Sequence, residues 1–468
     1  MMQYVADLWS VLDRASARWL GCQFGRASRA ASSTGCHSGT VPKSRSAVPA
    51  VLAGALVALQ AAAVGLAQAP AGLPARANPL PANSATTASR ATLLVATLDG
   101  RLLPAEGLRA ADDGYVLLGA NGEIRLPHDQ LLALHGAATV EAGLPCAWLA
   151  GGDVVRGALV GGDEAGDALE LLSPTLDKVT VAVDRLLALT RNAQSVPADL
   201  ALPEGVTEAV FRRAKFGFDL VVGSVHQFGS RGVRFASQGE AEPKWLALDD
   251  LVGLRIADPL PREGEAEAML WTRTGDRLGV ALRGADAEGL RCELEGGRAA
   301  VVRWTDVAAL VRRGRAMHLS DLEPVQVAES GFDGDTLYPW QRDRAVLGGP
   351  LVAGGRSYGK GLGVHGKARL VYRVPEGVDR FWTRVALDDT AAALSVRPSV
   401  DVRVLVDSEV AWAHKDLVAG IEPVDTGVLA VRAGQRLTLE VEFGAGRELG
   451  DRVAWLLPVF LPARTKGS

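Results

Sequence analysis

The chain has 468 residues, of which 48% are hydrophobic and 5% aromatic, and its formal net charge at pH 7 is −4. At roughly 100 to 200 residues per domain this length predicts about three domains, and the composition excludes a disordered or collagen-like chain. Six basic and two acidic residues lie in positions 1–46, so this stretch carries +4 and the remainder about −8. Because a nucleic-acid-binding body normally presents a basic face, we expect no nucleic-acid partner.

Residues 1–69 have the features of a basic leader with a signal peptide. The apolar run 47–69 carries no charge, follows Lys43 and Arg45, and ends on a small-x-small triplet. This pattern is typical of a secretory signal. The run is also long enough for a membrane anchor, but its many alanines favour cleavage, with membrane contact only through an uncleaved leader. We expect a secreted or periplasmic, cell-envelope protein, with an over-extended start and a Pro/Ser-rich linker over 70–90.

Four similar stretches in the middle of the chain predict an internal repeat. They read HDQLLAL, VDRLLAL, LDDLVGL and WTDVAAL, and they end on Leu134, Leu189, Leu254 and Leu310. In three units a Gly/Asp turn precedes that leucine, by 34, 37 and 35 residues counted from the turn glycine. Short alternating apolar runs lie between, as in strands and hairpins. We expect two β units over 91–190, a connector with one short helix over 191–214, and two further units over 215–315.

Each of these units is expected to be a small meander closed on itself, in outline similar to Sm-like and SH3-like barrels. The third unit, from Phe216 to Leu254, lacks an evident opening glycine turn. Downstream of the leader only Cys146 and Cys292 remain. Two cysteines so far apart do not make a disulfide framework, so we expect two buried thiols, with a bridge as the alternative.

From residue 316 onward the chain predicts an antiparallel β-sandwich of jelly-roll type. The alternating runs RLVYRV, RFWTRVAL, VDVRVLVD and RLTLEVEF are separated by glycine turns. Five segments in this order resemble the NPCBM/NEW2 domain, a novel putative carbohydrate-binding module. They are HLSDLEPVQVAESGFDGD, LGGPLVAGGRSYGKGLGVHGKARLVYRV, FWTRVALDDTA, VRVLVDSEVAW and GDRVAWLLPVF. The chain departs from the family pattern at Gly366-Lys367, Ser408 and Leu456-Leu457.

The resemblance implies sugar binding, which needs an aromatic platform and a few polar side chains. The candidate carbohydrate-binding residues are Trp340, Tyr358, Lys360, His365, Asp389, Asp407 and Trp412. Core packing and turn anchoring are the alternatives for these side chains. Paired aspartates after a strand also suit a structural calcium ion, and its candidate ligands are Asp388, Asp389 and Asp451.

We expect no catalytic role. The β units occupy 91–310 and leave no room for a glycosidase barrel of roughly 250 residues, and the chain has no H-E-x-x-H motif and no Walker-type loop. The sequence therefore predicts an exported, non-catalytic multi-module protein whose partner is a glycan or polysaccharide. The alternative is an envelope scaffold that contacts envelope proteins through a degenerate sugar-binding module.

Overall fold

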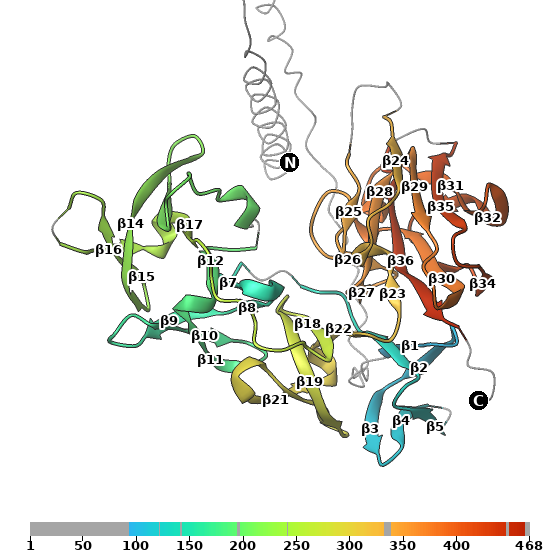
Figure 1. The fold of residues 1–468 in the computed structure, drawn as a ribbon, viewed down its shortest axis with the longest axis horizontal. Helices are drawn as coiled ribbons and strands as arrows, with labels where there is room; N and C mark the ends of the chain where they lie inside the picture. The colour runs from blue at the N-terminus through green and yellow to red at the C-terminus, as the bar shows by residue number, and fades with distance from the viewer. Residues whose placement is uncertain are drawn as a thin grey trace, which may run out of the picture. The chain divides into compact units, whose positions relative to one another are not determined.

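The computed structural model describes residues 93–463, except 121, 141–142, 194–196, 241, 332–337 and 446–448. By its contacts the chain divides into residues 1–82 and 83–468, and all described residues belong to the second unit. The predicted leader and linker lie outside the described residues. No helix in the described ranges is long and apolar enough to cross a membrane. The described chain is nearly all β (Figure 1), which confirms the predicted fold class.

The strands between residues 93 and 312 are grouped into four successive β units, two of six strands and two of five. Unit one contains β1 (Leu93–Thr97), β2 (Leu102–Ala105), β3 (Gly107–Ala111), β4 (Gly114–Gly119), β5 (Gly122–Pro127) and β6 (Leu131–His135). Unit two contains β7 (Cys146–Leu149), β8 (Val154–Arg156), β9 (Ala158–Gly162), β10 (Ala168–Ser173), β11 (Asp177–Ala182) and β12 (Leu186–Thr190). Unit three contains β13 (Glu208–Arg213), β14 (Phe218–Gly229), β15 (Gly232–Ser237), β16 (Lys244–Ala247) and β17 (Leu251–Ile256). Unit four contains β18 (Ala268–Thr272), β19 (Arg277–Ala285), β20 (Gly289–Glu293), β21 (Ala299–Arg303) and β22 (Val307–Arg312).

In every unit the first strand pairs antiparallel with both the second and the last strand. The last strands then pair between units. Leu134 of β6 lies opposite Leu310 of β22, and Leu189 of β12 lies opposite Leu254 of β17. The four leucines aligned by the sequence pattern therefore face one another in two antiparallel pairs, and all four are buried.

The expected closure of each unit into a barrel is wrong for the described strands. Strands from all four units join one large sheet, while β3-β4-β5 and β9-β10-β11 form separate three-stranded sheets. The physical reason is the pairing just described, because the last strand of each unit pairs with a neighbouring unit. Edge protection thus comes from pairing between units.

The stretch expected to be a connector contains β13. The structure has one 3-10 turn there, Pro197–Asp199, and no longer helix among the described residues of 191–214. Gly217, with φ of +74°, supplies the opening turn that the third unit was thought to lack, 37 residues before Leu254. Strand β13 escaped prediction because it is buried on both faces. Val210 packs in the main core and Phe211 in a second cluster with Leu200, so no alternation of apolar and polar residues marks it.

The C-terminal part is an antiparallel β-sandwich, as predicted (Figure 1). One sheet has the order β24 (Gln326–Glu329), β29 (Ala368–Arg373), β35 (Arg436–Phe443), β31 (Ser399–Val406), β32 (Glu409–Val418). The other has the order β25 (Gln341–Arg342), β28 (Gly361–His365), β36 (Arg452–Pro462), β30 (Val378–Leu387), β33 (Val424–Asp425), with β23 (Met317–His318) on β36 and β34 (Leu429–Ala430) on β30. A hairpin of β26 (Leu351–Ala353) and β27 (Arg356–Tyr358) and a short helix, α2 (Asp389–Ala392), complete it. Its core includes Tyr372, Phe381, Trp455 and Phe460.

The sandwich also contacts the β units. Trp382 packs in a buried cluster with Ala96 and Leu132 of unit one and Val311 of unit four. The side chains of Cys146 and Cys292 are both buried, and burial raises the pKa of Cys292 to about 11.

Candidate functional site

The seven candidate sugar-binding residues do not converge on one place. Tyr358 is 4% exposed, and its ring centroid lies 4.3 Å from that of His135 in β6. Its hydroxyl accepts a hydrogen bond from Nη1 of Arg384 at 2.9 Å, and burial raises its pKa. Because the ring is buried against another side chain, no face of Tyr358 is open to a sugar.

Lys360 is held by two carboxylates. Its Nζ makes ion pairs with Asp321 and, at 2.8 Å, with Asp343, and little of the side chain is exposed. These bonds tie the start of β28 to the segments before β24 and after β25. Lys360 therefore has a structural role in this arrangement.

Asp389 and Asp407 anchor turns. The two carboxylate oxygens of Asp389 accept hydrogen bonds from two consecutive glycine amides of the β26–β27 turn, each at 2.8 Å. Those of Asp407 accept from the backbone N–H of Arg436 at 2.8 Å and from the amide of Gln435 at 2.9 Å. Both residues therefore fit the alternative expected from the sequence, in which the side chain anchors a turn.

The three candidate calcium ligands do not fit a shared ion site. Asp388 caps α2, with Oδ1 accepting from the backbone N–H of Thr390 at 2.9 Å and of Ala391 at 3.2 Å, and burial raises its pKa. Both oxygens of Asp389 are used as just described, and Asp451 is fully buried. Within the described residues no group of three or more His, Cys, Asp or Glu side chains is placed to hold a metal ion.

Trp412 lies on β32, at one edge of the five-stranded sheet. It is half-buried, and its ring lies parallel to that of His414 with centroids 6.3 Å apart. Strand β24, which leads to the segment containing Trp340, lies at the opposite edge of the same sheet. Trp412 and Trp340 therefore cannot contact the same sugar ring.

His365 and Trp340 do lie close to a shared feature, which we call the aromatic patch: Tyr338, Trp340 and His365. Tyr338 is 39% exposed and stacks on the nearly buried His365, with ring centroids 4.6 Å apart and an interplanar angle of 27°. Nδ1 of His365 lies 2.7 Å from the carbonyl oxygen of Gly366. The Trp340 ring is half-buried, and the Arg342 guanidinium lies over it, 4.9 Å from the ring centroid. Tyr338 thus has one ring face against His365 and is partly open to solvent.

Polar groups surround the patch. Oε1 of Glu329 accepts a hydrogen bond from the backbone N–H of Trp340 at 2.7 Å, and burial raises the pKa of Glu329. Reciprocal backbone hydrogen bonds of 3.1 and 3.2 Å join Ser330 and Lys367. A hollow of about 10 Å³ between these residues and Tyr338 has room for one water molecule. The hollow is therefore too small to hold a sugar ring.

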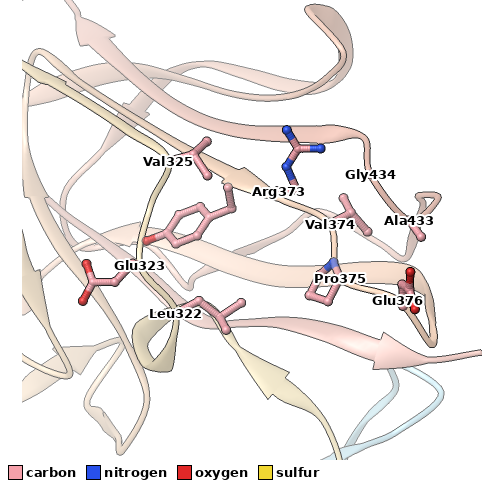
Figure 2. Close-up of a pocket in the computed structure, with 10 residues that line it drawn as sticks. Leu322, Glu323, Val325, Arg373, Val374, Pro375, Glu376, Ala433 and Gly434 are labelled. Atoms are coloured by element: carbon pink, nitrogen blue, oxygen red, sulfur yellow. The ribbon is translucent and has the colours of Figure 1, made fainter.

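A larger groove, of about 490 Å³, lies at the opposite end of the five-stranded sheet, where β29 ends and β35 begins. Figure 2 shows the residues that line it. They are Leu322, Glu323, Val325, Tyr372, Arg373, Val374, Pro375, Glu376, Ala433 and Gly434. None of the seven predicted residues lines this groove, although Asp407 is bonded to the strand start beside it.

Residues 315–461 match the family model of the NPCBM/NEW2 domain. This confirms the resemblance of the C-terminal sandwich. No curated protein matches the chain.

Solved structures of CBM51 modules are similar to parts of this chain. The CBM51 module of a Clostridium perfringens GH95 protein, in complex with methyl-galactose, is 22% identical, covers 31% of this chain and 99% of its own, and has a TM-score of 0.27. CBM51-2 with the INT domains of Clostridium perfringens ZmpB, in complex with GlcNAc, is 20% identical over 40% of this chain and 41% of its own, with a TM-score of 0.28. The tandem CBM51 modules of a Streptococcus pneumoniae family 98 glycoside hydrolase are 11% identical over 79% of this chain and 88% of their own, with a TM-score of 0.28.

Within the NPCBM/NEW2 segment, the run from Gly355 to Gly359 has the letters of a G-x-S-x-G nucleophile elbow. That motif needs a serine exposed on a sharp turn from a strand into a helix. Ser357 instead lies in the hairpin strand β27, is buried, and accepts a hydrogen bond from the backbone N–H of Thr139 at 2.8 Å. The match is therefore one of spacing, without the geometry of a nucleophile.

The sequence-based selection missed Tyr338 of the aromatic patch and two residues beside it, Glu329 and Lys367. The triplet Tyr-Pro-Trp over 338–340 was an available signal, because a proline between two aromatic residues is typical of an exposed turn. Glu329 and Lys367 carried no such signal. Only strand pairing brings them to Tyr338.

Proposed function

We propose that this chain is an exported, non-catalytic multi-module protein that binds carbohydrate through its C-terminal sandwich. The match of residues 315–461 to a carbohydrate-binding module family supports sugar binding as the general activity. The uncharged run 47–69 after a basic flank supports export. The buried Ser357 supports a non-catalytic sandwich, since a nucleophile must reach its substrate.

The observation that carries the proposal is the exposed ring of Tyr338 stacked on His365. One face of a pyranose ring is apolar and its edge carries hydroxyl groups, so it packs on an aromatic face with polar groups around the rim. The Tyr338 ring supplies the face. Glu329 and Lys367 line the adjoining hollow. Glu329 supplies an acceptor for hydroxyl groups, and the Lys367 ammonium, which makes an ion pair of 3.2 Å with Glu442, supplies a donor.

The support beneath the platform is rigid. His365 ends β28, which is paired along its length with β36, and the bonds between Ser330 and Lys367 fix the end of β24 beside it. A preformed platform loses little conformational entropy on binding. Since the site is shallow, we expect weak binding of single sugars and tighter binding where several copies meet a polysaccharide.

The test is binding of the full chain to a glycan panel, followed by calorimetry. The panel contains galactose-, glucose-, N-acetylglucosamine- and uronate-type glycans. We expect binding to at least one class, unchanged by a metal chelator because Asp388 and Asp389 are committed to backbone hydrogen bonds, and no release of reducing sugar. Absence of binding across all classes would contradict the proposal.

One observation favours the alternative, an envelope scaffold that contacts proteins. Unit three exposes three large apolar side chains at and just before the start of β14, namely Phe216, Phe218 and Leu220, with Phe216 84% exposed. Exposed apolar clusters of this kind mark interaction surfaces. A negative glycan panel, together with self-association in analytical ultracentrifugation that Phe218→Ser abolishes, would favour the scaffold.

A further inference from the structure

The groove at the end of β29 has the size and lining of a ligand site. Its volume of about 490 Å³ falls within the roughly 300 to 1,000 Å³ of small-molecule pockets. Aliphatic side chains supply much of its surface, from Leu322, Val325, Val374 and Pro375 (Figure 2). It shares no lining residue with the hollow beside Tyr338, although Arg342, which is ion-paired with the groove residue Glu323, also lies over the Trp340 ring.

One arginine, Arg373, lines this groove, and a second, Arg436, lies beside it on the neighbouring strand. Arg373, the last residue of β29, lies directly opposite Arg436, the first residue of β35, in the antiparallel register, and both are exposed. Directly opposed side chains have Cβ atoms about 4.5–5.5 Å apart, and like charges there are destabilising. Among the described residues neither guanidinium makes an ion pair.

A few residues further along the same face of the sheet, arginine side chains lie beside a glutamate. Arg369, on the same side of β29 as Arg373, lies opposite Glu440, and Glu440 in turn makes an ion pair of 3.2 Å with Arg403. The unmatched pair is therefore particular to the groove end. The carboxylate of Asp407 lies beside Arg436, but its oxygens accept from the Arg436 backbone and from Gln435.

The carboxylates in the groove wall suit neutral hydroxyl groups. Glu323 makes an ion pair of 2.7 Å with Arg342, and Glu376 is exposed at the rim. An acceptor at the rim, two guanidiniums on one side and an aliphatic floor together match a molecule with hydroxyl groups, one acidic group and an apolar face. An acidic sugar has these three features.

We propose that this groove is a second ligand site, and that it binds a saccharide carrying a carboxylate or sulfate group. Arg373 and Arg436 hold the acidic group, since guanidinium and carboxylate or sulfate form charge-assisted, bidentate pairs. The aliphatic lining lies under the ring. The choice of a saccharide rests on the proposed function, but the residues involved are separate from the aromatic patch.

The experiment compares polygalacturonate, a sulfated glycosaminoglycan and a neutral galactan by calorimetry on the full chain and on the Arg373→Gln, Arg436→Gln and Arg397→Gln variants. Arg397 is an exposed arginine outside the groove, so its substitution removes the same charge elsewhere. We expect the acidic polymers to bind and each groove substitution to weaken this binding about tenfold, with no change in the Arg397→Gln variant. Raising the salt to about 0.5 M should weaken binding of the acidic polymers alone.

Two outcomes would overturn the inference. One is that acidic polymers do not bind, or bind equally well to Arg373→Gln, while a neutral glycan binds. That result would be consistent with sugar binding at the aromatic patch and would contradict ligand binding in the groove. The other is an equal loss in the Arg397→Gln variant, which indicates attraction by overall charge. If no glycan binds at all, the proposed function itself fails. Circular dichroism of each variant checks that the fold is kept.

Discussion

Two buried tyrosines of the sandwich differ in one hydrogen bond. The Tyr372 hydroxyl is buried and has no hydrogen-bond partner among the described residues, and burial raises its pKa. The Tyr358 hydroxyl accepts from Arg384. A buried polar group without a partner carries its full desolvation cost, whereas a bonded one recovers it. Replacing the two hydroxyls should therefore have opposite effects.

We expect Tyr372→Phe to raise the free energy of unfolding by about 1 kcal/mol and Tyr358→Phe to lower it by about 1–3 kcal/mol. Urea unfolding of both variants against the parent chain gives the comparison. Since each substitution removes only one oxygen, Tyr358→Phe is the matched control for Tyr372→Phe. Equal destabilisation by both would show that the Tyr372 hydroxyl has a partner.

At the scale of elements, two hairpin turns of the β units exchange hydrogen bonds. Oδ1 of Asp153, before β8, accepts from the backbone N–H of Gly279 in β19 at 2.9 Å. Oδ1 of Asp276, before β19, accepts from the backbone N–H of Arg156 in β8 at 2.7 Å. Each aspartate thus binds the amide three residues after the other one. This exchange joins units two and four next to Val154 and Arg277, the one residue pair that links β8 and β19.

Asp276→Ala should lower the free energy of unfolding by about 2–4 kcal/mol, measured by urea unfolding. Asp276 is fully buried and accepts from Arg156 and, through Oδ2, from the hydroxyls of Thr272 and Thr274 at 2.6 and 3.0 Å. Its removal leaves these donors unsatisfied. Asp250→Ala, at an exposed position before β17, should change stability by less than about 0.5 kcal/mol. Similar effects of the two substitutions would contradict the structural role of Asp276.

At the scale of the whole molecule, buried histidines make stability depend on pH. Burial, with the nearby Arg384 guanidinium, lowers the pKa of His135 to about 3, and burial with the Lys360 ammonium lowers that of His318 to about 4. In the unfolded chain both pKa values are about 6.5. Below pH 6.5 the unfolded state therefore binds protons that the folded state does not, and stability falls as the pH falls toward 4.

Between pH 7 and pH 5 each histidine should lower the free energy of unfolding by about 2 kcal/mol. His135→Phe keeps a ring against Tyr358 and removes one of these contributions. The loss of stability between pH 7 and pH 5, from urea unfolding at both values, should thus be smaller by about 2 kcal/mol in the variant. An equal loss in both proteins would mean that His135 is protonated in the folded state.

The sequence predicts the presence of strands better than the site. The four leucines of the repeated pattern lie in the last strand of each unit. They mark that strand because its buried end needs an apolar residue at a fixed distance from the turn that opens the unit. Which strands pair between units depends on contacts far apart in sequence, so the open sheet could not be predicted. Strand β13 is buried on both faces. This burial stabilises the strand and also removes the alternation of apolar and polar residues by which it could have been predicted.

Site residues were harder to predict because exposure is set by tertiary packing. Tyr358 and Tyr338 are both aromatic residues near glycine-rich turns, yet Tyr358 packs on His135 and Tyr338 faces solvent. Asp389 and Asp407 were chosen as hydroxyl acceptors, but their oxygens are used by local backbone and side-chain donors. The opposition of Arg373 and Arg436 appears only in the strand register.

The central claim is that a sugar ring packs on Tyr338. Its most direct test is calorimetric titration of the best-binding neutral glycan into the full chain and the Tyr338→Ala and Trp412→Ala variants. We expect Tyr338→Ala to weaken binding about tenfold or more and Trp412→Ala, at the opposite edge of the sheet, to leave the dissociation constant unchanged. Unchanged binding by Tyr338→Ala, or loss of binding in Trp412→Ala alone, would contradict it.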